Sequence, residues 1–232
     1  YGLRKPAEVA AALNARMTAD AGLDEYFTMV YGVANLFTGS VRMVREAKAR
    51  GLKVTAEACP HHFTLTEELT RGYNTHAKMN PPLRTMQDVQ AIKEGLRDGT
   101  IDVIATDHAP HATQEKQQEF TEAPFGIVGL ETALSLTLAL VDEGVLTLES
   151  AVDKLATAPA KAFSLNAGTL AVGAPADVAI VDPNREWQVD PSRFRSKSRN
   201  TPFAGWKVKG RVTTTIVSGR VVFELDRSER QA

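Results

Sequence analysis

The stretch "IDVIATDHAPH", residues 101–111, decides how this chain is interpreted. Four of its first five residues are apolar, with isoleucine and valine prominent, which is typical of a strand buried inside a sheet. The stretch then runs directly into Asp107, His108 and His111. Loops at the carboxyl ends of parallel strands carry the active sites of β/α folds. An acid and two imidazoles at this place are therefore candidates for chemistry.

Strand patterns alternate with helix patterns around this stretch. Residues 40–51 have apolar residues at helical spacing, and residues 53–59, "KVTAEAC", have the pattern of a strand. Residues 85–99 form a second helical pattern with Thr85 as a candidate N-cap, just before the strand pattern of residues 101–107. Strand, helix and strand at this spacing predict parallel β/α units.

The sequence pattern changes at about residue 167, from mainly helical segments to short β-rich ones. Before it, further helical patterns cover three segments: 6–21, 129–144 and 147–163. A short strand is also plausible at residues 26–34. After it come short β-rich segments separated by Gly, Pro and Asp. We therefore expect a β/α region over residues 1–166 and a small β-sandwich-like subdomain over residues 167–232.

Composition excludes several classes of function. Hydrophobic residues make up 43%, charged residues 24%, and the formal net charge is −1, so nothing favours nucleic acid or a membrane surface as a partner. The longest apolar runs, such as residues 133–141, are too short to span a bilayer, and no signal region is visible, which predicts a cytoplasmic protein. Cys59 is the only cysteine, which excludes an internal disulfide and a multi-cysteine zinc cluster, so we expect nitrogen and oxygen ligands to hold any bound metal.

The side chains after residue 106 have both a chemical and a structural interpretation. A carboxylate such as Asp107 can ligate a metal, and it can receive or relay the proton of an attacking hydroxide. His108 and His111 could ligate, donate a hydrogen bond or cap the turn. An aspartate after a strand is also a common turn-capping residue, so this motif alone leaves both interpretations open.

The segment "CPHHF", residues 59–63, follows the preceding strand in the same way. It falls on the same face as Asp107 if the two strands are neighbours. Adjacent residues of an extended chain point to opposite sides, so we expect that His61 and His62 do not ligate one ion together. One of them is then structural.

Two loops are candidates for substrate contact. In "HAKMNPPLRT", residues 76–85, Asn80 precedes two prolines that hold the loop extended, so its amide can orient a polar substrate or belong to a rigid connection. In "APFGIVG", residues 123–129, glycines permit close approach of the backbone to a ligand, or merely a turn.

Six stretches together strongly resemble the dihydroorotases of the bacterial amidohydrolase superfamily. They are "VTAEACPHHFTLTEE", "KMNPPLRT", "IDVIATDHAPH", "APFGIVGLETALSL", "GTLAVGAPADVAIVD" and "NTPFAGWKVKGRV", in order between residues 40 and about 223. The resemblance implies an α/β fold, the C-terminal part of a TIM-type (β/α)8 barrel followed by a small β-rich subdomain. It implies zinc as the cofactor and reversible hydrolysis of the cyclic amide of dihydroorotate to N-carbamoyl aspartate in pyrimidine biosynthesis. "NPPLR" with "PFGIVG" favours dihydroorotase over hydantoinase or allantoinase.

The resemblance also implies roles for five residues. Asp107 resembles the metal-ligating aspartate and general acid/base at the end of the last barrel strand. Asn80 and His111 resemble substrate-contacting residues. Phe125 and Gly126 fall where the backbone of the family meets the pyrimidine ring.

Departures from the family concentrate at the start of the chain. The family carries a His-x-His on its first barrel strand, a bridging carboxylate or carboxylated lysine, and two histidines on middle strands. Here no histidine precedes His61, and Ala34 stands where the family has a metal histidine. His61 and His62 match a family motif that is not itself a ligand set. Asp107 alone is too little for catalytic zinc, which typically needs about three protein ligands, so the metal-binding part over residues 1–39 is absent or altered.

Two hypotheses follow from these observations. In the first, the chain is the C-terminal part of a dihydroorotase whose chemistry requires the missing strands; the retention of Asp107, Asn80 and His111 favours it. In the second, the chain is a non-catalytic dihydroorotase-like subunit that assembles with aspartate transcarbamoylase, which the missing metal histidines favour. About three strands of an eight-stranded barrel leave open sheet edges, so both hypotheses predict an oligomer or a partner subunit.

Overall fold

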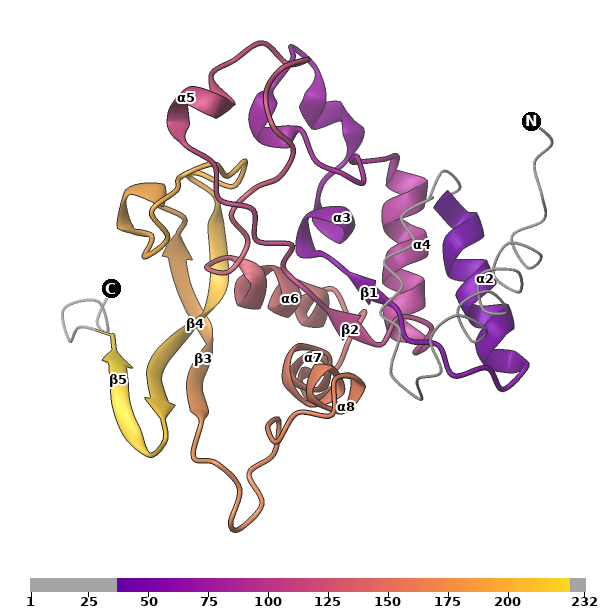
Figure 1. Cartoon of the computed structure of the whole chain (residues 1–232), viewed down its shortest axis with the longest axis vertical. Coiled ribbons are helices and arrows are strands. Elements are labelled where there is room, and N and C mark those ends of the chain that lie inside the picture. The colour runs from indigo at the N-terminus through magenta and orange to yellow at the C-terminus, as the bar shows by residue number, and fades with distance from the viewer. Residues whose placement is uncertain (1–36, 226–232) are drawn as a thin grey trace, which may run out of the picture.

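The computed structural model describes residues 37–225, coloured along the chain in Figure 1. The helix expected at residues 6–21 and the strand expected at 26–34 lie outside the described residues. The elements are, in order, α2 (Phe37–Ala49), β1 (Glu57–Ala58), α3 (Pro60–Thr64), η1 (Glu67–Thr70), η2 (Thr75–Ala77), α4 (Met86–Arg97), β2 (Val103–Ile104), α5 (Thr113–Lys116), α6 (Ala133–Asp142), α7 (Leu148–Val152), the π-helical turn η3 (Asp153–Thr157), α8 (Ala158–Ala162), β3 (Val178–Gln188), η4 (Pro191–Arg193), β4 (Lys207–Val217) and β5 (Arg220–Glu224).

Strands β1 and β2 pair in parallel near the middle of the molecule (Figure 1). Glu57 pairs with Val103 and Ala58 with Ile104. The hydrogen bond from the N–H of Ala105 to the carbonyl of Ala58, 3.1 Å, continues the ladder. The prediction of parallel β/α units is therefore confirmed for this pair. The ladder is shorter than the patterns of residues 53–59 and 101–107 predicted, since each strand has only one strand neighbour within residues 37–225.

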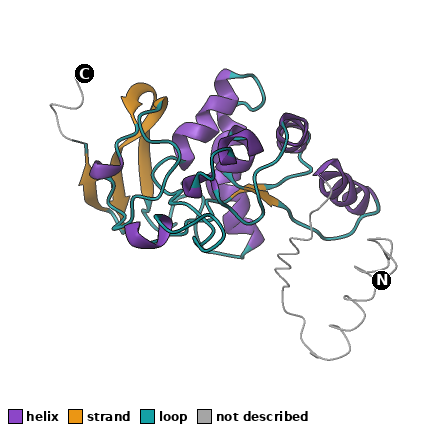
Figure 2. Cartoon of the chain, turned by 90° about the horizontal axis from the view of Figure 1, so that it is seen from above, coloured by secondary structure: helices purple, strands orange, loops and turns teal. Residues whose placement is uncertain are grey.

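Helices α2 and α4 lie side by side next to this pair (Figures 1 and 2). Asp102, just before β2, joins α2 to the sheet: its carboxylate accepts the backbone N–H of Ala56 at 2.9 Å and pairs with Lys48 of α2 at 2.6 Å. Helix α4 begins where the sequence predicted, after Thr85. The carboxylate of Asp88 accepts the N–H of Thr85, and the N–H of Asp88 donates to the hydroxyl of Thr85, which is a capping box.

The hydrophobic core is one continuous cluster that includes residues from α3, α4, β2, α6 and the segments around them. Phe63, Leu96, Ile127, Leu140 and Phe203 are each at most 1% exposed. Because Phe203 lies more than a hundred residues after Phe63, the late part of the chain is packed into the same core as the early part.

The late β-rich part forms one antiparallel sheet in the order β3-β4-β5. Figure 2 shows this sheet at one end of the molecule, with the helices beside it. Helix α6 packs against β4, where the hydroxyl of Ser135 donates to the carbonyl of Gly210 at 2.7 Å and the indole N–H of Trp187 donates to the same carbonyl at 3.0 Å. The predicted division of the chain at residue 167 stays a prediction.

Among the described residues, no helix combines the length and the apolar character needed to cross a bilayer.

Replacing Thr85 with Ala should lower the free energy of unfolding by about 1 kcal/mol, because the first turn of α4 loses the side-chain acceptor of its capping box. Urea denaturation followed by circular dichroism measures this change. Thr85→Ser retains the hydroxyl and is the matched control. Equal stability of the Ala variant and the wild type would contradict the role of this cap.

Candidate functional site

Two loops emerge side by side at the carboxyl ends of β1 and β2. Cys59 and α3 follow β1, and Asp107 follows β2 after two residues. Asp107 is exposed and has a φ of +46°, a backbone conformation that is uncommon for a non-glycine residue and common at functional turns. Its negative charge favours the protonated forms of Cys59 and His62, adding to the effect of burial on the pKa of Cys59 and opposing it on that of His62, so the three groups lie within electrostatic reach of one another. The expectation that "CPHHF" and Asp107 share one face is therefore met.

The premise used for the two adjacent histidines was wrong. His61 and His62 do not lie on an extended segment: Pro60 stands at the first position of helix α3, and both histidines lie in that helix. Their ring centroids are 4.2 Å apart. One ligand atom each from Cys59, His61 and His62 lies within 4.8 Å of the others, so these residues could hold a metal ion. The expectation of nitrogen and oxygen ligands alone was also too narrow, since the thiol of the single cysteine belongs to this group.

Burial sets the charge of these three side chains. It lowers the pKa of His61 to about 3, with a smaller contribution from His62. Burial also lowers the pKa of His62, against the hydrogen bond to Pro81 and the charge of Asp107. The pKa of Cys59 is raised to about 12 by burial first, then by Asp107 and Glu57. At neutral pH the two rings are neutral and the thiol is protonated.

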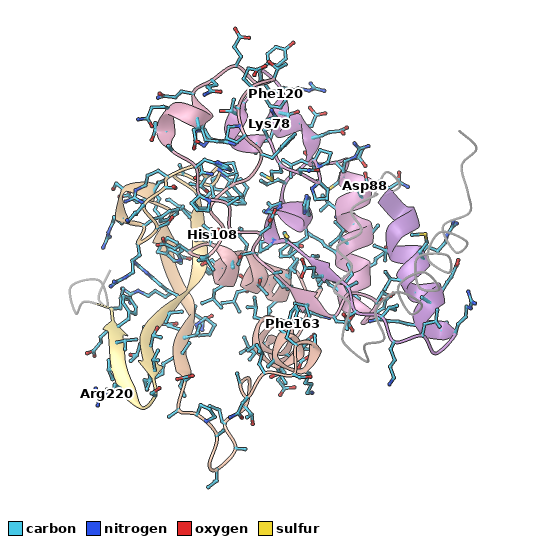
Figure 3. The ribbon with its side chains drawn as sticks, in the orientation of Figure 1. Lys78, Asp88, His108, Phe120, Phe163 and Arg220 are labelled. Carbon is cyan, nitrogen blue, oxygen red and sulfur yellow. The ribbon has the colours of Figure 1, made fainter. Side chains whose placement is uncertain are left out.

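His108, labelled in Figure 3, has a structural role. Its Nδ1 atom accepts the backbone N–H of Gly129 at 3.1 Å and that of Leu130 at 3.4 Å. His108 also forms a parallel bridge with Ile127, and the N–H of Ala109 donates to the carbonyl of Ile127 at 2.8 Å. The loop after Asp107 is thus attached to the segment of residues 123–129.

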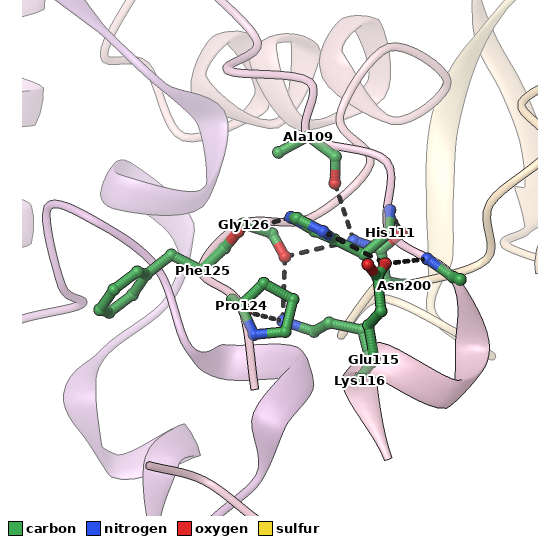
Figure 4. A network of polar contacts seen from close by, with 9 residues as sticks. Ala109, His111, Glu115, Lys116, Pro124, Phe125, Gly126 and Asn200 are labelled. Atoms are coloured by element: carbon green, nitrogen blue, oxygen red, sulfur yellow. Dashed lines mark hydrogen bonds and ion pairs between the residues drawn. The ribbon is translucent and has the colours of Figure 1, made fainter. Parts of the chain in front are cut away.

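Asn200 forms hydrogen bonds that connect its own segment to residues 109–111 and to residues 126–128 (Figure 4). Its side-chain oxygen accepts the N–H of His111 at 3.2 Å, and its amide N–H groups donate to the carbonyls of Ala109 at 2.8 Å and Gly126 at 3.2 Å. Its own carbonyl accepts the N–H of Val128 at 3.0 Å. Asn200 is 3% exposed, so these bonds are shielded from water.

His111, Phe125 and Gly126, three of the predicted site residues, come together in this network. The Nε2–H of His111 donates to the carbonyl of Phe125 at 2.7 Å (Figure 4). Gly126 has a φ of +107°, and a Cβ atom there would lie 2.4 Å from the Cβ of Ala109. Only glycine fits this position. The side chain of Phe125 is 53% exposed.

Two buried lysines hold the same loop from the other side. Lys116, 2% exposed, donates to the carbonyls of Pro124 at 2.9 Å and Gly126 at 3.1 Å. Lys78 donates to the carbonyls of Thr121 at 3.0 Å and Ala123 at 2.6 Å. The ammonium group of Lys78 also lies over two aromatic rings of this region, those of Phe120, beside it in Figure 3, and Phe125, at 5.5 and 4.6 Å from the ring centroids.

Asn80 lies apart from this network. Its side chain is exposed and its peptide bond to Pro81 is cis. Its neighbours in the sequence contact both the α3 histidines and the loop of Gly126. The carbonyl of Pro81 accepts the Nε2–H of His62 at 2.9 Å, and the carbonyl of Lys78 accepts the N–H of Gly126 at 2.9 Å. No direct contact between Asn80 and Asp107 is found among the described residues.

Sequence reasoning did not identify Asn200, Lys78 or Lys116 as part of the site. Asn200 opens "NTPFAGWKVKGRV", a stretch whose resemblance to the family was noted, and this was the available signal. Lys116 sits in the polar run "ATQEKQQE", which reads as a surface segment, so no pattern marks it as buried.

With this geometry in view, comparison with known proteins identifies the family. The sequence profile of the amidohydrolase family matches residues 13–222. The chain belongs to the amidohydrolase family. Its curated relatives include proteins named dihydroorotase from Syntrophotalea carbinolica, 56% identical over 225 residues, and Geobacter metallireducens, 54% identical over 215 residues. These alignments cover 97% and 92% of this chain but 52% and 51% of the relatives, so the chain spans about half their length.

Solved structures of the amidohydrolase family resemble the described fold. The L-hydantoinase of Arthrobacter aurescens superposes with a TM-score of 0.76 at 33% identity, covering 81% of this chain and 43% of that one. The D-hydantoinase of a Thermus species gives a TM-score of 0.74 at 29% identity, covering 80% and 42%. The predicted fold class, part of a TIM-type barrel with a β-rich region after it, is confirmed. Amidohydrolases are generally metal-dependent, in keeping with the donor group of Cys59, His61 and His62.

Replacing Asn200 with Ala should lower the free energy of unfolding by about 2–4 kcal/mol, because the carbonyls of Ala109 and Gly126 lose their buried donors. Urea denaturation measures this loss. Asn200→Asp keeps the acceptor but removes the donors and should destabilise at least as much. Asn184→Ala, at an exposed asparagine, is the control, with a change within about 0.5 kcal/mol. A similarly small change in Asn200→Ala would contradict the role of the network.

Lys116 should make stability depend on pH above neutrality. Burial first, and then the charge of Lys78, lower its pKa from 10.5 to about 8. Between these values the unfolded chain binds more protons than the folded chain, so the free energy of unfolding contributed by Lys116 rises with pH, by roughly 1–3 kcal/mol. The penalty of burying its charge is fully present below pH 8.

Lys116→Met should abolish this rise. Urea denaturation at pH 7.5 and 10.5 for the variant and the wild type measures it, and the difference between the two proteins cancels the opposite contribution of Cys59. Lys161→Met, at an exposed lysine, should keep the wild-type pH dependence. The same pH dependence in Lys116→Met would show that the buried ammonium group is not the cause.

Proposed function

We propose that this chain supplies the C-terminal part of a zinc-dependent dihydroorotase active site, which hydrolyses the cyclic amide of dihydroorotate reversibly to N-carbamoyl aspartate in pyrimidine biosynthesis. The names of its relatives support this proposal. The observation that carries it is the attachment of the Asp107 loop, through His108 and Ala109, to the segment that presents Phe125 and Gly126. An exposed carboxylate and a fixed wall for the pyrimidine ring thus occupy adjoining loops at the ends of strands.

The roles of the wall residues follow from their contacts. Both backbone groups of Gly126 are already bonded within the protein, so this residue serves by its lack of a side chain. Phe125 presents its exposed ring to the substrate. His111 holds the Phe125 carbonyl in place through its Nε2–H, and its Nδ1 lies 3.7 Å from the carboxylate of Glu115. Asn80 offers its exposed amide to the polar edge of the ring.

Asp107 carries the proton in the proposed reaction. It accepts a proton from the attacking water as the new C–O bond forms, and it delivers that proton to the ring nitrogen as the C–N bond breaks. Zinc, when bound, would supply polarisation of the amide carbonyl and acidification of water. Asp107 is the proposed metal ligand, and since zinc needs about three protein ligands, the remaining ones come from other parts of the protein. The roughly twofold greater length of the relatives allows for them.

We also propose that further strands complete the sheet. The β1–β2 pair has no third strand within residues 37–225, and such uncovered edges are normally paired or shielded. The occupant is the rest of the same protein, a second copy or a partner subunit such as aspartate transcarbamoylase. Light scattering of the purified chain tests self-assembly, and a strictly monomeric chain would contradict the second copy. Light scattering of the chain mixed with aspartate transcarbamoylase tests the partner subunit, and the absence of a complex would contradict it.

Asp107→Asn should lower the rate of dihydroorotate hydrolysis by about 10²- to 10⁴-fold, because the amide cannot accept and return the proton. The assay follows carbamoyl aspartate formed with added zinc by the chain complemented with the part of a curated dihydroorotase that this chain does not cover, which supplies the remaining zinc ligands. Asp153→Asn, at an exposed aspartate outside the site, should retain the wild-type rate.

Two outcomes would contradict the proposal. A clear preference for hydantoin or dihydrouracil over dihydroorotate would give this site the chemistry named for its solved neighbours. No turnover of dihydroorotate by the complemented, zinc-loaded chain would instead favour a non-catalytic subunit.

A further inference from the structure

The group formed by Cys59, His61 and His62 is not used by the proposed hydrolysis. Its three donor atoms lie within 4.8 Å of one another at the start of α3. Ligands at about 2.0–2.3 Å from a tetrahedral zinc ion lie roughly 3.5 Å apart, so small side-chain rotations bring this group to binding geometry. Cys59 is 9% exposed and His61 2% exposed, so these two members are shielded from solvent, while His62 is half-buried.

His61 has a buried atom without a partner. Its Nε2 atom is inaccessible to solvent and makes no hydrogen bond in the described part of the chain. Buried polar atoms are nearly always paired with protein, water or an ion. The Nε2 atom of a neutral imidazole can donate its lone pair to a cation, and burial keeps His61 neutral.

His62 is already oriented as a ligand. Its Nε2 atom lies 2.9 Å from the carbonyl of Pro81. A carbonyl can only accept, so the proton is on Nε2 and the lone pair is on Nδ1. Histidines that bind metals characteristically donate their second ring N–H to a backbone carbonyl or a carboxylate in this way. The loop of residues 80–82 therefore fixes the tautomer that ligation requires.

A nucleophilic cysteine beside a histidine is the other role that these residue types suggest. Such pairs depend on a thiolate stabilised by a nearby positive charge. Here both rings are kept neutral by burial, and the neighbouring charges of Asp107 and Glu57 are negative. The surroundings of Cys59 therefore oppose a free thiolate and leave metal coordination as the role that fits.

We propose that Cys59 Sγ, His61 Nε2 and His62 Nδ1 together bind one divalent cation of the zinc class, and that the carboxylate of Asp107 adds attraction for its charge. A thiolate with two imidazoles selects zinc or cobalt over magnesium or calcium. The thiol proton leaves to solvent as the sulfur–metal bond forms. This site does not depend on the proposed hydrolase function.

Cobalt(II) is the probe that tests this site. Metal-free chain should bind one cobalt ion and show a thiolate-to-cobalt charge-transfer band in the near ultraviolet, with the intense visible bands of tetrahedral cobalt. Because Cys59 is the only cysteine, the band can arise only from its sulfur. Bound zinc should also protect Cys59 from alkylation. Cobalt binding without the band, or no binding at micromolar metal, would overturn the proposal.

Substitutions identify the ligands. Cys59→Ser should abolish the band, and His61→Gln or His62→Gln should each weaken cobalt binding by about 100-fold or more. His76→Gln, at a histidine outside the group, should leave it unchanged. Asp107→Asn should keep the band while hydrolysis is lost, which separates this site from the hydrolase proposal. The alkylation assay on the wild-type chain keeps the test valid if a variant does not fold.

Discussion

The hydrogen bonds of Asn200 are the constraint on which the rest of the site depends. One buried amide satisfies the backbone of the loop after β2 and of the loop that carries Phe125 and Gly126. Each of these backbone groups would be costly to bury unpaired, so the hydrogen bonds of Asn200 hold the two loops against each other. Because Asn200 lies between η4 and β4, the late β-rich part of the chain contributes directly to the site.

The contacts of Asn200 connect the two parts of the chain that were inferred from the sequence, residues 1–166 and 167–232. A division near residue 167 follows the change in texture from helices to short strands, but Asn200 and Phe203 lie beyond it and pack into the site and the core. The bonds from Ser135 and Trp187 to Gly210 add a second junction between α6 and the sheet. A small antiparallel sheet has little core of its own, so it gains stability from this contact with the helical part.

The sequence predicted the helices more completely than the site. Capping at Thr85 and the parallel order of β1 and β2 followed from local patterns, because caps and strand-helix alternation are local properties. Asn200 and Lys116 were missed because their partners lie far away in the sequence and their own segments are polar. His61 and His62 were misplaced for a local reason: Pro60 starts a helix directly after the strand, where the alternation of an extended chain no longer applies.

The short helix α3 has a further consequence: directly after β1 it brings the donor atoms of Cys59, His61 and His62 close to one another. In an extended continuation, His62 would point away from His61, and the carbonyl of Pro81 would have no ring N–H to accept. In the helix, the two rings stand 4.2 Å apart beside the thiol, and the loop of residues 80–82 reaches back to orient one of them. The same loop bears Asn80, and Asp107 follows the neighbouring strand β2. The carboxyl ends of β1 and β2 therefore carry the Cys59, His61 and His62 group, the carboxylate of Asp107 and a candidate substrate-binding loop. The two strand ends are neighbours because β1 and β2 pair in parallel.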